Sequence, residues 1–427
     1  MSAQTPLSLD TLRSAVRDAA AIRAVSRLQP AGGPGDKLFP SSYAVGDREP
    51  TKYAVEQRRV DGQTVECVLL DSVASQANRM EEALRRAWDR GQLTDLPVIA
   101  VDFSASEGLE DLDRITALDA PHRIADALLR DASLDGTPFR FSPPGEALTR
   151  ARPDNAGPLF RWCPTALVFG VWDSTGPRGG MGSKFPRALV SEVVGINSVR
   201  GVKTASRLDP AGIEIKAATL LEAKDASQMW TLDESEAVME GKAAKKYGRT
   251  KSESGKPSAA NHGNVAPSIE DRAGGVTMDY AVQTTVLSLT ALRRLGFPTD
   301  GDNQPVSRER RAQVEQAAHT ALAALGLAAI ALSRDEGYYF RSRCHLVPQG
   351  PLSFELIDRD GAISGPFTLS RTQAIDLLHQ AADAARAAGI GWEQGEISLK
   401  PAPKLVALIQ RSRTVKATGQ GDEQAEK

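Results

Sequence analysis

Three cations in and beside a glycine-rich segment have the residue types and spacing best suited to binding a polyanion. Arg178, Lys184 and Arg187 lie within or directly after residues 176–186, which contain four glycines and no acidic residue. Glycine lets the backbone adopt positive φ and approach another chain without a Cβ in the way. The segment therefore favours a cationic loop that contacts a phosphate backbone. An ordinary solvated surface loop fits the same composition.

A second cationic segment covers residues 241–275. It has no apolar periodicity, and up to residue 256 its cations face a single acidic residue, Glu253. Such a segment is either a disordered linker or an arm that becomes ordered on nucleic acid. Its cations are Lys242, Lys245, Lys246, Arg249, Lys251 and Lys256.

The start of a predicted helix offers a third place for a phosphate. Residues 65–70 have the composition of a strand, and residues 73–88 then place an apolar side chain every three or four positions. Arg79 lies near the positive end of this helix, where free N–H groups attract anions. The alternative is a core-packing helix capped by Asp71 or Ser72.

The elements that would position these residues alternate irregularly between strands and helices, which predicts an α+β fold. Helical spacing of apolar residues predicts a helix over residues 12–25, and a buried β-branched run predicts a strand over 167–171. Further strands are expected over 96–102, 338–347, 352–357 and 405–409, and further helices over 308–332 and 371–388. Residues 276–298 end with a helix C-terminal signature.

The composition of the whole chain limits the class of protein. A formal charge of −2 over 427 residues excludes a globally basic nucleic-acid protein, so any polyanion site must be local. Three distant cysteines without CxxC spacing argue against disulfides and structural zinc, and fit a reduced compartment. The N-terminus has neither a cationic start nor an apolar segment, and no window holds 18 consecutive apolar residues. We therefore expect neither secretion nor a membrane span.

Residues with catalytic chemistry are few and isolated. The glycine-rich loop does not have the P-loop spacing, because Lys184 is followed by Phe185 rather than Ser or Thr. Asp71 and Asp173 lack a second carboxylate that would complete a metal site. His122 has no His or Cys partner at metal-ligand spacing. We expect no catalytic residue, no metal and no cofactor.

Six motifs occur in order between residues 71 and 298. They are DSVASQANRMEEAL (71–84), PHRIADA (121–127), LVFGVWDS (167–174), KFPRALVSEVVG (184–195), NHGNVAPS (261–268) and GGVTMDYAVQTTVLSLTALRRLGFP (274–298). As an ordered set they resemble one family, the RAMP-type backbone subunit of the type I-U (also called I-G) CRISPR interference complex, or Csb family. Residues 299–427 match only in general character.

The resemblance implies a modified RRM-like (ferredoxin-like) palm with long inserted loops that form finger and thumb arms. We accordingly expect an N-terminal helix and irregular segment over residues 1–60, the palm with its insertions over 61–410, and a disordered tail over 411–427. The insertions would be the glycine-rich loop at about 176–186 and the basic arm at 241–275.

The resemblance also implies that many copies assemble along one CRISPR RNA in the cytoplasm. They would hold its backbone and leave the bases free to pair with target DNA. The expected partners are the CRISPR RNA, the target DNA strand, other copies of the chain and other subunits of the effector complex. The type I resemblance implies no cleavage, because a separate nuclease degrades the DNA.

Charge and position within the motifs select the side chains that we expect to face the RNA. Two other classes of function remain open: a metal- or nucleotide-dependent nuclease that uses the glycine-rich loop, and a protein-interaction module in which residues 241–275 are only a linker. The expected RNA-facing residues are Arg79, Arg178, Lys184, Arg187, Lys242, Lys245, Lys246, Arg249, Lys251, Lys256, Asn261, His262 and Asn264.

Overall fold

The computed structural model describes residues 5–46, 48–176, 182–225, 227–248, 254–300 and 304–417. The expected RNA-facing residues Arg178, Arg249 and Lys251 lie outside this set. The chain divides into two compact units. Unit 1 comprises residues 1–45, 53–199 and 276–406, and unit 2 comprises residues 46–52, 200–275 and 407–427.

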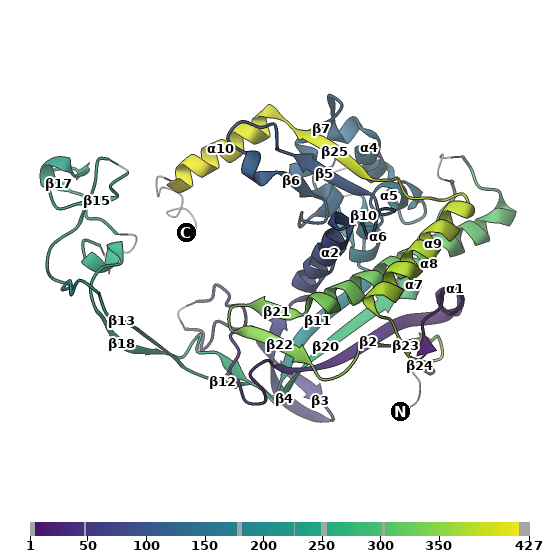
Figure 1. The fold of residues 1–427 in the computed structure, drawn as a ribbon, viewed down its shortest axis with the longest axis horizontal. Helices are drawn as coiled ribbons and strands as arrows, with labels where there is room; N and C mark the ends of the chain where they lie inside the picture. Colours follow the sequence, from purple (N-terminus) through teal and green to yellow (C-terminus); the bar gives the residue numbers. More distant parts are fainter. Residues whose placement is uncertain are drawn as a thin grey trace. The chain divides into compact units, whose positions relative to one another are not determined.

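Unit 1 is built on one large sheet with the strand order β1-β24-β23-β2-β20-β11-β4-β3 (Figure 1). The hairpin of β21 and β22 joins this sheet at β2, and all neighbours are antiparallel except β1 and β24. The strands are β1 (Thr5–Pro6), β2 (Ala19–Pro30), β3 (Val55–Val60), β4 (Gln63–Asp71), β11 (Leu189–Ile196), β20 (Tyr280–Ser288), β21 (Tyr338–Arg341), β22 (Cys344–Pro348), β23 (Ser353–Asp358) and β24 (Ile363–Thr368).

The central strand β2 corrects one expectation. We expected a helix over residues 12–25, but α1 (Leu9–Asp18) ends at Asp18 and β2 begins at the next residue. Ile22, Ala24 and Leu28 are buried on one side of β2 and alternate with more exposed residues. This two-residue period is the pattern of a strand with one buried face. The same segment also has apolar residues at helical spacing, but the structure follows the two-residue period.

Helices α2 (Val73–Asp89) and α8 (Arg308–Glu336) lie against one face of the large sheet, and a third helix, α9 (Arg371–Ala387), packs on α8. α2 packs on β11 and on α8. Gly326 of α8 lies against β20, since a Cβ at this position would be 3.2 Å from Leu287 Cδ1. α8 is long and apolar enough to cross a membrane, but 83% of its apolar window is buried inside the protein, as in a core helix.

A second sheet in unit 1 has the order β6-β5-β25-β7-β8, with β5 and β25 parallel. The expected strand over residues 167–171 is wrong, because α6 occupies most of it. That apolar run is fully buried, and periodicity does not separate a helix from a strand in such a short run. The elements are β5 (Val98–Asp102), β6 (Arg114–Thr116), β7 (Ala132–Leu134), β8 (Thr137–Pro138), β25 (Glu396–Pro401), α3 (Ala127–Arg130), α4 (Pro143–Arg150), α5 (Gly157–Trp162) and α6 (Thr165–Phe169).

Unit 2 is a small module of short antiparallel strand pairs. Leu221, Ala223 and Ala237 are buried in it. The segment 241–275, expected to lack a core face, thus contributes β17 and β18 to a folded module. The pairs are β13 (Lys203–Arg207) with β18 (Val265–Glu270), β14 (Leu221–Glu222) with β15 (Trp230–Thr231), and β16 (Met239–Glu240) with β17 (Ala243–Ala244).

The C-terminal part of the described chain is helical. α10 (Pro403–Ala417) replaces the strand expected over residues 405–409 and continues past residue 411. Proline is well suited to the first turn of a helix, which is where Pro403 lies.

The remaining elements are β9 (Val171–Trp172), β10 (Lys184–Phe185), β12 (Val199–Arg200), β19 (Val276–Thr277), α7 (Leu289–Leu292), and the 3-10 helices η1 (Glu110–Leu112), η2 (Arg123–Ala125), η3 (Phe139–Phe141), η5 (Glu234–Glu236) and η6 (Pro257–Ala260).

Candidate nucleic-acid interface

The glycine-rich segment is the loop of a β-hairpin. β9 pairs antiparallel with β10, and Asp173 N donates to Ser183 O at 2.9 Å. The ends of the loop are therefore held side by side, and the hairpin lies between α6 and β11 in the chain.

Polar contacts attach both ends of this loop to the rest of unit 1. The Asp173 carboxylate is 2% exposed and pairs with Arg140, whose Nη2 lies 2.7 Å from Oδ1. Ser183 Oγ donates to Ala151 O at 2.7 Å, and Arg130 Nη1 donates to Thr175 Oγ1 at 3.1 Å. Asp173 thus has a structural partner within unit 1.

Lys184 and Trp172 are exposed side chains on the two strands of the hairpin. They are direct partners across β10 and β9, and Lys184 Nζ lies 5.0 Å from the centre of the indole ring. Trp172 is 52% exposed. An aromatic face beside a cation suits a nucleobase and its phosphate. The sequence analysis selected Lys184 but missed Trp172, although its position directly before a cationic loop was a usable signal.

Arg187 contacts the backbone just before the hairpin. Its Nε donates to Phe169 O at 3.2 Å. Burial, together with the neighbouring charge of Arg123, lowers the pKa of Arg187 from its ordinary value. The guanidinium therefore binds the protein's own backbone.

Arg123 and Glu81 form a buried ion pair next to Arg187, and the sequence analysis selected neither. Arg123 Nε and Nη2 donate to the two Glu81 oxygens at 2.6 and 2.7 Å. The side chains are only 6% and 2% exposed. Burial raises the pKa of Glu81 to about 7, although the Arg123 charge acts in the opposite direction. Arg123 also has φ +53°, a left-handed conformation that costs a side chain of this kind roughly 1–2 kcal/mol.

Arg79 is engaged within the protein. Its Nε lies 3.0 Å from Asp71 Oδ2, its Nη2 donates to Phe340 O at 3.0 Å, and its guanidinium stacks over the Phe340 ring. Ser72, not Asp71, caps α2. Gln76 also donates to Asp71, which leaves this carboxylate 6% exposed. At the start of α2, Arg79 and Gln76 thus form a polar network around Asp71.

The lysines expected in the basic arm differ in their surroundings. Lys242 and Lys246 are exposed, whereas Lys245 pairs with Glu222 at 2.7 Å. Lys256 is exposed at the start of η6. Lys242 and Lys246 are therefore better candidates for contact with a polyanion than Lys245.

Asn261, His262 and Asn264 stabilise a loop of unit 2. Asn264 Oδ1 accepts from Asp209 N at 2.8 Å, and Asp209 Oδ2 accepts from Gly263 N at 2.7 Å. Arg207 donates to His262 O at 2.8 Å. Backbone N–H groups, above all that of Gly263, hold the pKa of Asp209 below its ordinary value. Asn261 ends η6 in the left-handed conformation. The expected RNA-facing trio thus has local structural roles.

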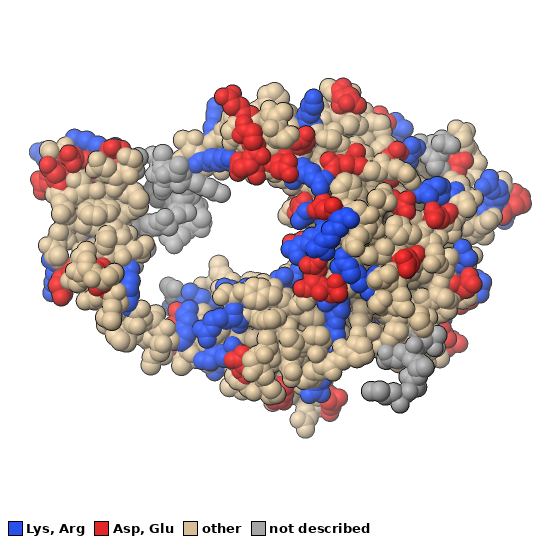
Figure 2. All heavy atoms as spheres, in the orientation of Figure 1, with Lys and Arg blue, Asp and Glu red and all other residues tan. Residues whose placement is uncertain are grey.

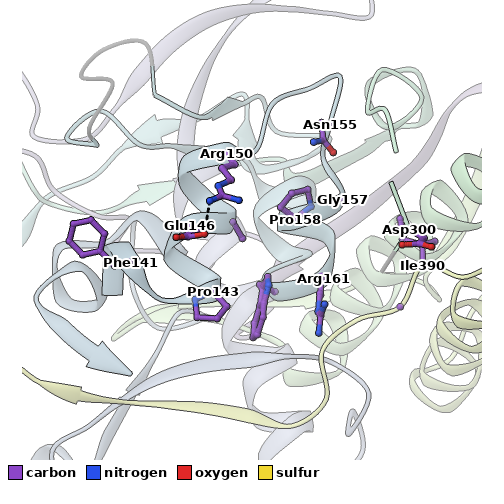
Figure 3. Close-up of a pocket in the computed structure, with 13 residues that line it drawn as sticks. Phe141, Pro143, Glu146, Arg150, Asn155, Gly157, Pro158, Arg161, Asp300 and Ile390 are labelled. Atoms are coloured by element: carbon purple, nitrogen blue, oxygen red, sulfur yellow. Dashed lines mark ion pairs between the residues drawn. The ribbon is translucent and has the colours of Figure 1, made fainter. Parts of the chain in front are cut away.

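A pocket of about 580 Å³ lies beside the second sheet of unit 1 (Figure 3). Arg150, one of its cations, pairs with Glu146 at 2.8 Å, and the other, Arg161, pairs with Glu393 at 2.8 Å. Its charges are thus compensated, which does not favour a polyanion. Its lining residues are Phe141, Pro143, Glu146, Ala147, Arg150, Asn155, Gly157, Pro158, Arg161, Trp162, Asp300, Ile390 and Gly391.

Charges elsewhere are mixed. On the face in Figure 2, Lys and Arg are interspersed with Asp and Glu, in keeping with surface pairs such as Arg85–Asp89 and Arg86–Glu82 on α2. Over the described part of the chain, no group of three His, Cys, Asp or Glu side chains could hold a metal ion.

The fold and these surfaces define an α+β protein with local cationic elements on a mixed-charge surface. Residues 22–200 match the family described as CRISPR-associated protein GSU0053. This match, which spans less than half of the chain and includes α2 and the hairpin, supports a CRISPR-associated protein.

The chain is also similar to the crystal structure of Csc2 from Thermofilum pendens. The two are 11% identical, the similarity covers 95% of this chain and 80% of that one, and the TM-score is 0.27. A TM-score this low does not establish a shared fold. No curated protein matches the chain.

Proposed function

We propose that this chain is a Csb-type RAMP backbone subunit that binds the CRISPR RNA in a type I effector complex. Several copies oligomerise along the guide and present it for pairing with target DNA. The observation that carries the proposal is the match of residues 22–200 to a CRISPR-associated family, since this region includes the glycine-rich hairpin with its exposed Trp172–Lys184 pair.

The strand order of the large sheet supports an RRM-like palm. An RRM has the chain order βαββαβ and the spatial strand order 4-1-3-2. The path β23-β2-β20-β11 has this order, with α2 before β11 and α8 between β20 and β23. In this interpretation the hairpin of β3 and β4 is an addition between β2 and α2, and unit 2 is an arm inserted between β11 and β20.

The RNA contacts are assigned to two elements. The first is the hairpin, where Lys184 neutralises a phosphate and Trp172 stacks on a base. The second is unit 2, where Lys242, Lys246 and Lys256 neutralise further phosphates. Arg178, Arg249 and Lys251 would add to these contacts. Recognition of this kind follows the backbone and leaves the base edges free.

The chain would act without catalysis of its own, in the cytoplasm, with other effector subunits and the target DNA strand as partners. The nuclease alternative would need a carboxylate cluster. Asp71 and Asp173, the acids considered for it, are each paired with an arginine.

The proposal is tested by size-exclusion chromatography of the chain co-expressed with a CRISPR RNA, with absorbance at 260 and 280 nm before and after ribonuclease. We expect a large RNA-containing species that is lost when Lys184, Lys242 and Lys246 are changed to Gln. In the matched control, Arg13, Arg17 and Arg152 are changed to Gln. These arginines are paired with nearby acids, and we expect the control variant to co-elute with RNA as the wild type does. An RNA-free monomer in the presence of the guide would contradict the proposal.

A further inference from the structure

The direction of the glycine-rich hairpin is set where β9 begins. Arg123 Nη1 donates to Gly170 O at 3.0 Å, and Arg187 Nε donates to Phe169 O at 3.2 Å. Two guanidinium groups therefore bind the two successive carbonyl groups that directly precede the hairpin. A change in either contact would change the path by which the backbone enters β9.

Arg123 is itself oriented by Glu81 of α2. The two-point contact with the carboxylate fixes the plane of the guanidinium, and its remaining side faces Gly170 O. Arg123 also lies over the Phe169 ring, with 5.5 Å between its Cζ and the ring centre. A continuous set of contacts thus runs from α2 through Arg123 to the residue before β9.

The backbone at both ends of this connection is unusual. Gly170 has φ +82°, and a Cβ there would lie 3.0 Å from Phe185 O, so the chain folds back closely on its own hairpin. Arg123 adopts positive φ without being glycine. Such conformations persist only where the surroundings enforce them, and they concentrate at functional sites.

We propose that Glu81 and Arg123 are positioning residues that hold the β9–β10 hairpin, and with it Trp172 and Lys184, in one fixed orientation. The link to RNA rests on the proposed function. The positioning itself is a property of the free chain and is measured without RNA.

The test is hydrogen exchange of the purified full chain at about pH 8. The variants are Glu81→Gln, and Arg123→Lys, which keeps the charge but cannot bind Glu81 at two points and Gly170 together. The control is Glu82→Gln, the next residue on α2, whose surface pair with Arg86 is away from the hairpin. We expect exchange of peptides 169–176 and 182–188 to rise by about tenfold or more in both variants and to stay unchanged in the control.

Peptides from α8 distinguish positioning from general stability. They should exchange as in the wild type. Faster exchange throughout the chain would show that the pair only supports the fold, and unchanged exchange in the hairpin would show that the pair does not hold it. Either result would overturn the proposal.

A double variant guards against loss of folding, because one unpaired buried charge is strongly destabilising. Glu81→Leu with Arg123→Met removes both charges and the contact to Gly170, so the hairpin alone should loosen. In RNA titrations, this variant should bind several-fold more weakly with an unchanged salt dependence, since no phosphate contact is deleted. Wild-type affinity with a loosened hairpin would overturn the role in RNA binding. A wild-type chain that binds no RNA would instead contradict the proposed function.

Discussion

Lys184 lies directly opposite Trp172 in the β9–β10 hairpin, with its ammonium group 5.0 Å from the indole centre. The strand pairing fixes this relationship. The cation and the aromatic face are thus presented together beside the glycine-rich loop, and they can be tested separately because they would recognise different parts of a nucleotide.

Trp172→Ala should weaken binding of single-stranded RNA by about 1–3 kcal/mol, the value of one base stacked on an aromatic ring. The salt dependence should stay the same because no phosphate contact is lost. Fluorescence titrations at several salt concentrations measure both quantities. Phe141→Ala is the control, since Phe141 is a 73% exposed aromatic residue of unit 1 outside the hairpin. Equal losses in the two variants would refute a specific role for Trp172.

Lys184→Gln should give the complementary result. Removing one phosphate contact lowers the salt slope of log K by about 0.7 for single-stranded nucleic acid. The same titrations measure this slope. A variant with weaker binding but a wild-type slope would mean that Lys184 acts by supporting Trp172 rather than by binding phosphate.

The lysines of unit 2 offer a comparison within one segment. The Lys242→Gln and Lys246→Gln variants should each lower RNA affinity and the salt slope. Lys245→Gln should have a smaller effect, because Lys245 already pairs with Glu222. Equal effects of all three changes would indicate that only the net charge of the segment matters.

The fold could be predicted where one signal dominates. The apolar stripe of residues 73–88 and the capping Ser72 predict a helix that is present as α2. The helix expected over 308–332 is present as α8. The strands expected over 96–102 and 352–357 are present as β5 and β23. In these segments local periodicity and tertiary burial favour the same structure.

Prediction of the secondary structure fails where the apolar residues of a segment fit both a helical and a strand period. Residues 19–25 fit both a helical and an alternating pattern, and only pairing with β20 and β23 makes them a strand. The site shows the same limit. Charge and position within the motifs selected Arg79, Arg187 and His262, but the contacts that these residues make within the protein are visible only after folding. Glu81 and Arg123, 42 positions apart, were missed for this reason.

Glu81 should make stability depend on pH in a defined direction. Its pKa is raised from 4.5 to about 7 in the folded state, mainly by burial. The folded protein therefore binds a proton more tightly than the unfolded chain between these values. The contribution of Glu81 to stability is fully present below about pH 4.5 and is lost as the pH rises through 7.

Denaturant unfolding of wild type and Glu81→Gln at several pH values measures this effect. Relative to the variant, the wild type should lose roughly 3 kcal/mol across the window. Glu82→Gln, at an exposed neighbouring position, should follow the wild type. Parallel curves for wild type and Glu81→Gln would mean that Arg123 keeps the carboxylate ionised throughout.

Substitution of Asp173 distinguishes the proposed RNA-binding scaffold from the alternative that the chain is a nuclease. Its carboxylate is buried and paired with Arg140 at the start of the glycine-rich loop, so Asp173→Asn leaves a partly buried arginine without this partner. Such a change typically costs about 3–5 kcal/mol, and we expect a clear fall in melting temperature. We expect neither the wild type nor Asp173→Asn to cleave an RNA complementary to the guide in the presence of Mg²⁺. Cleavage by the wild type that disappears in Asp173→Asn, with an unchanged melting temperature, would instead make Asp173 a catalytic residue and the chain a nuclease.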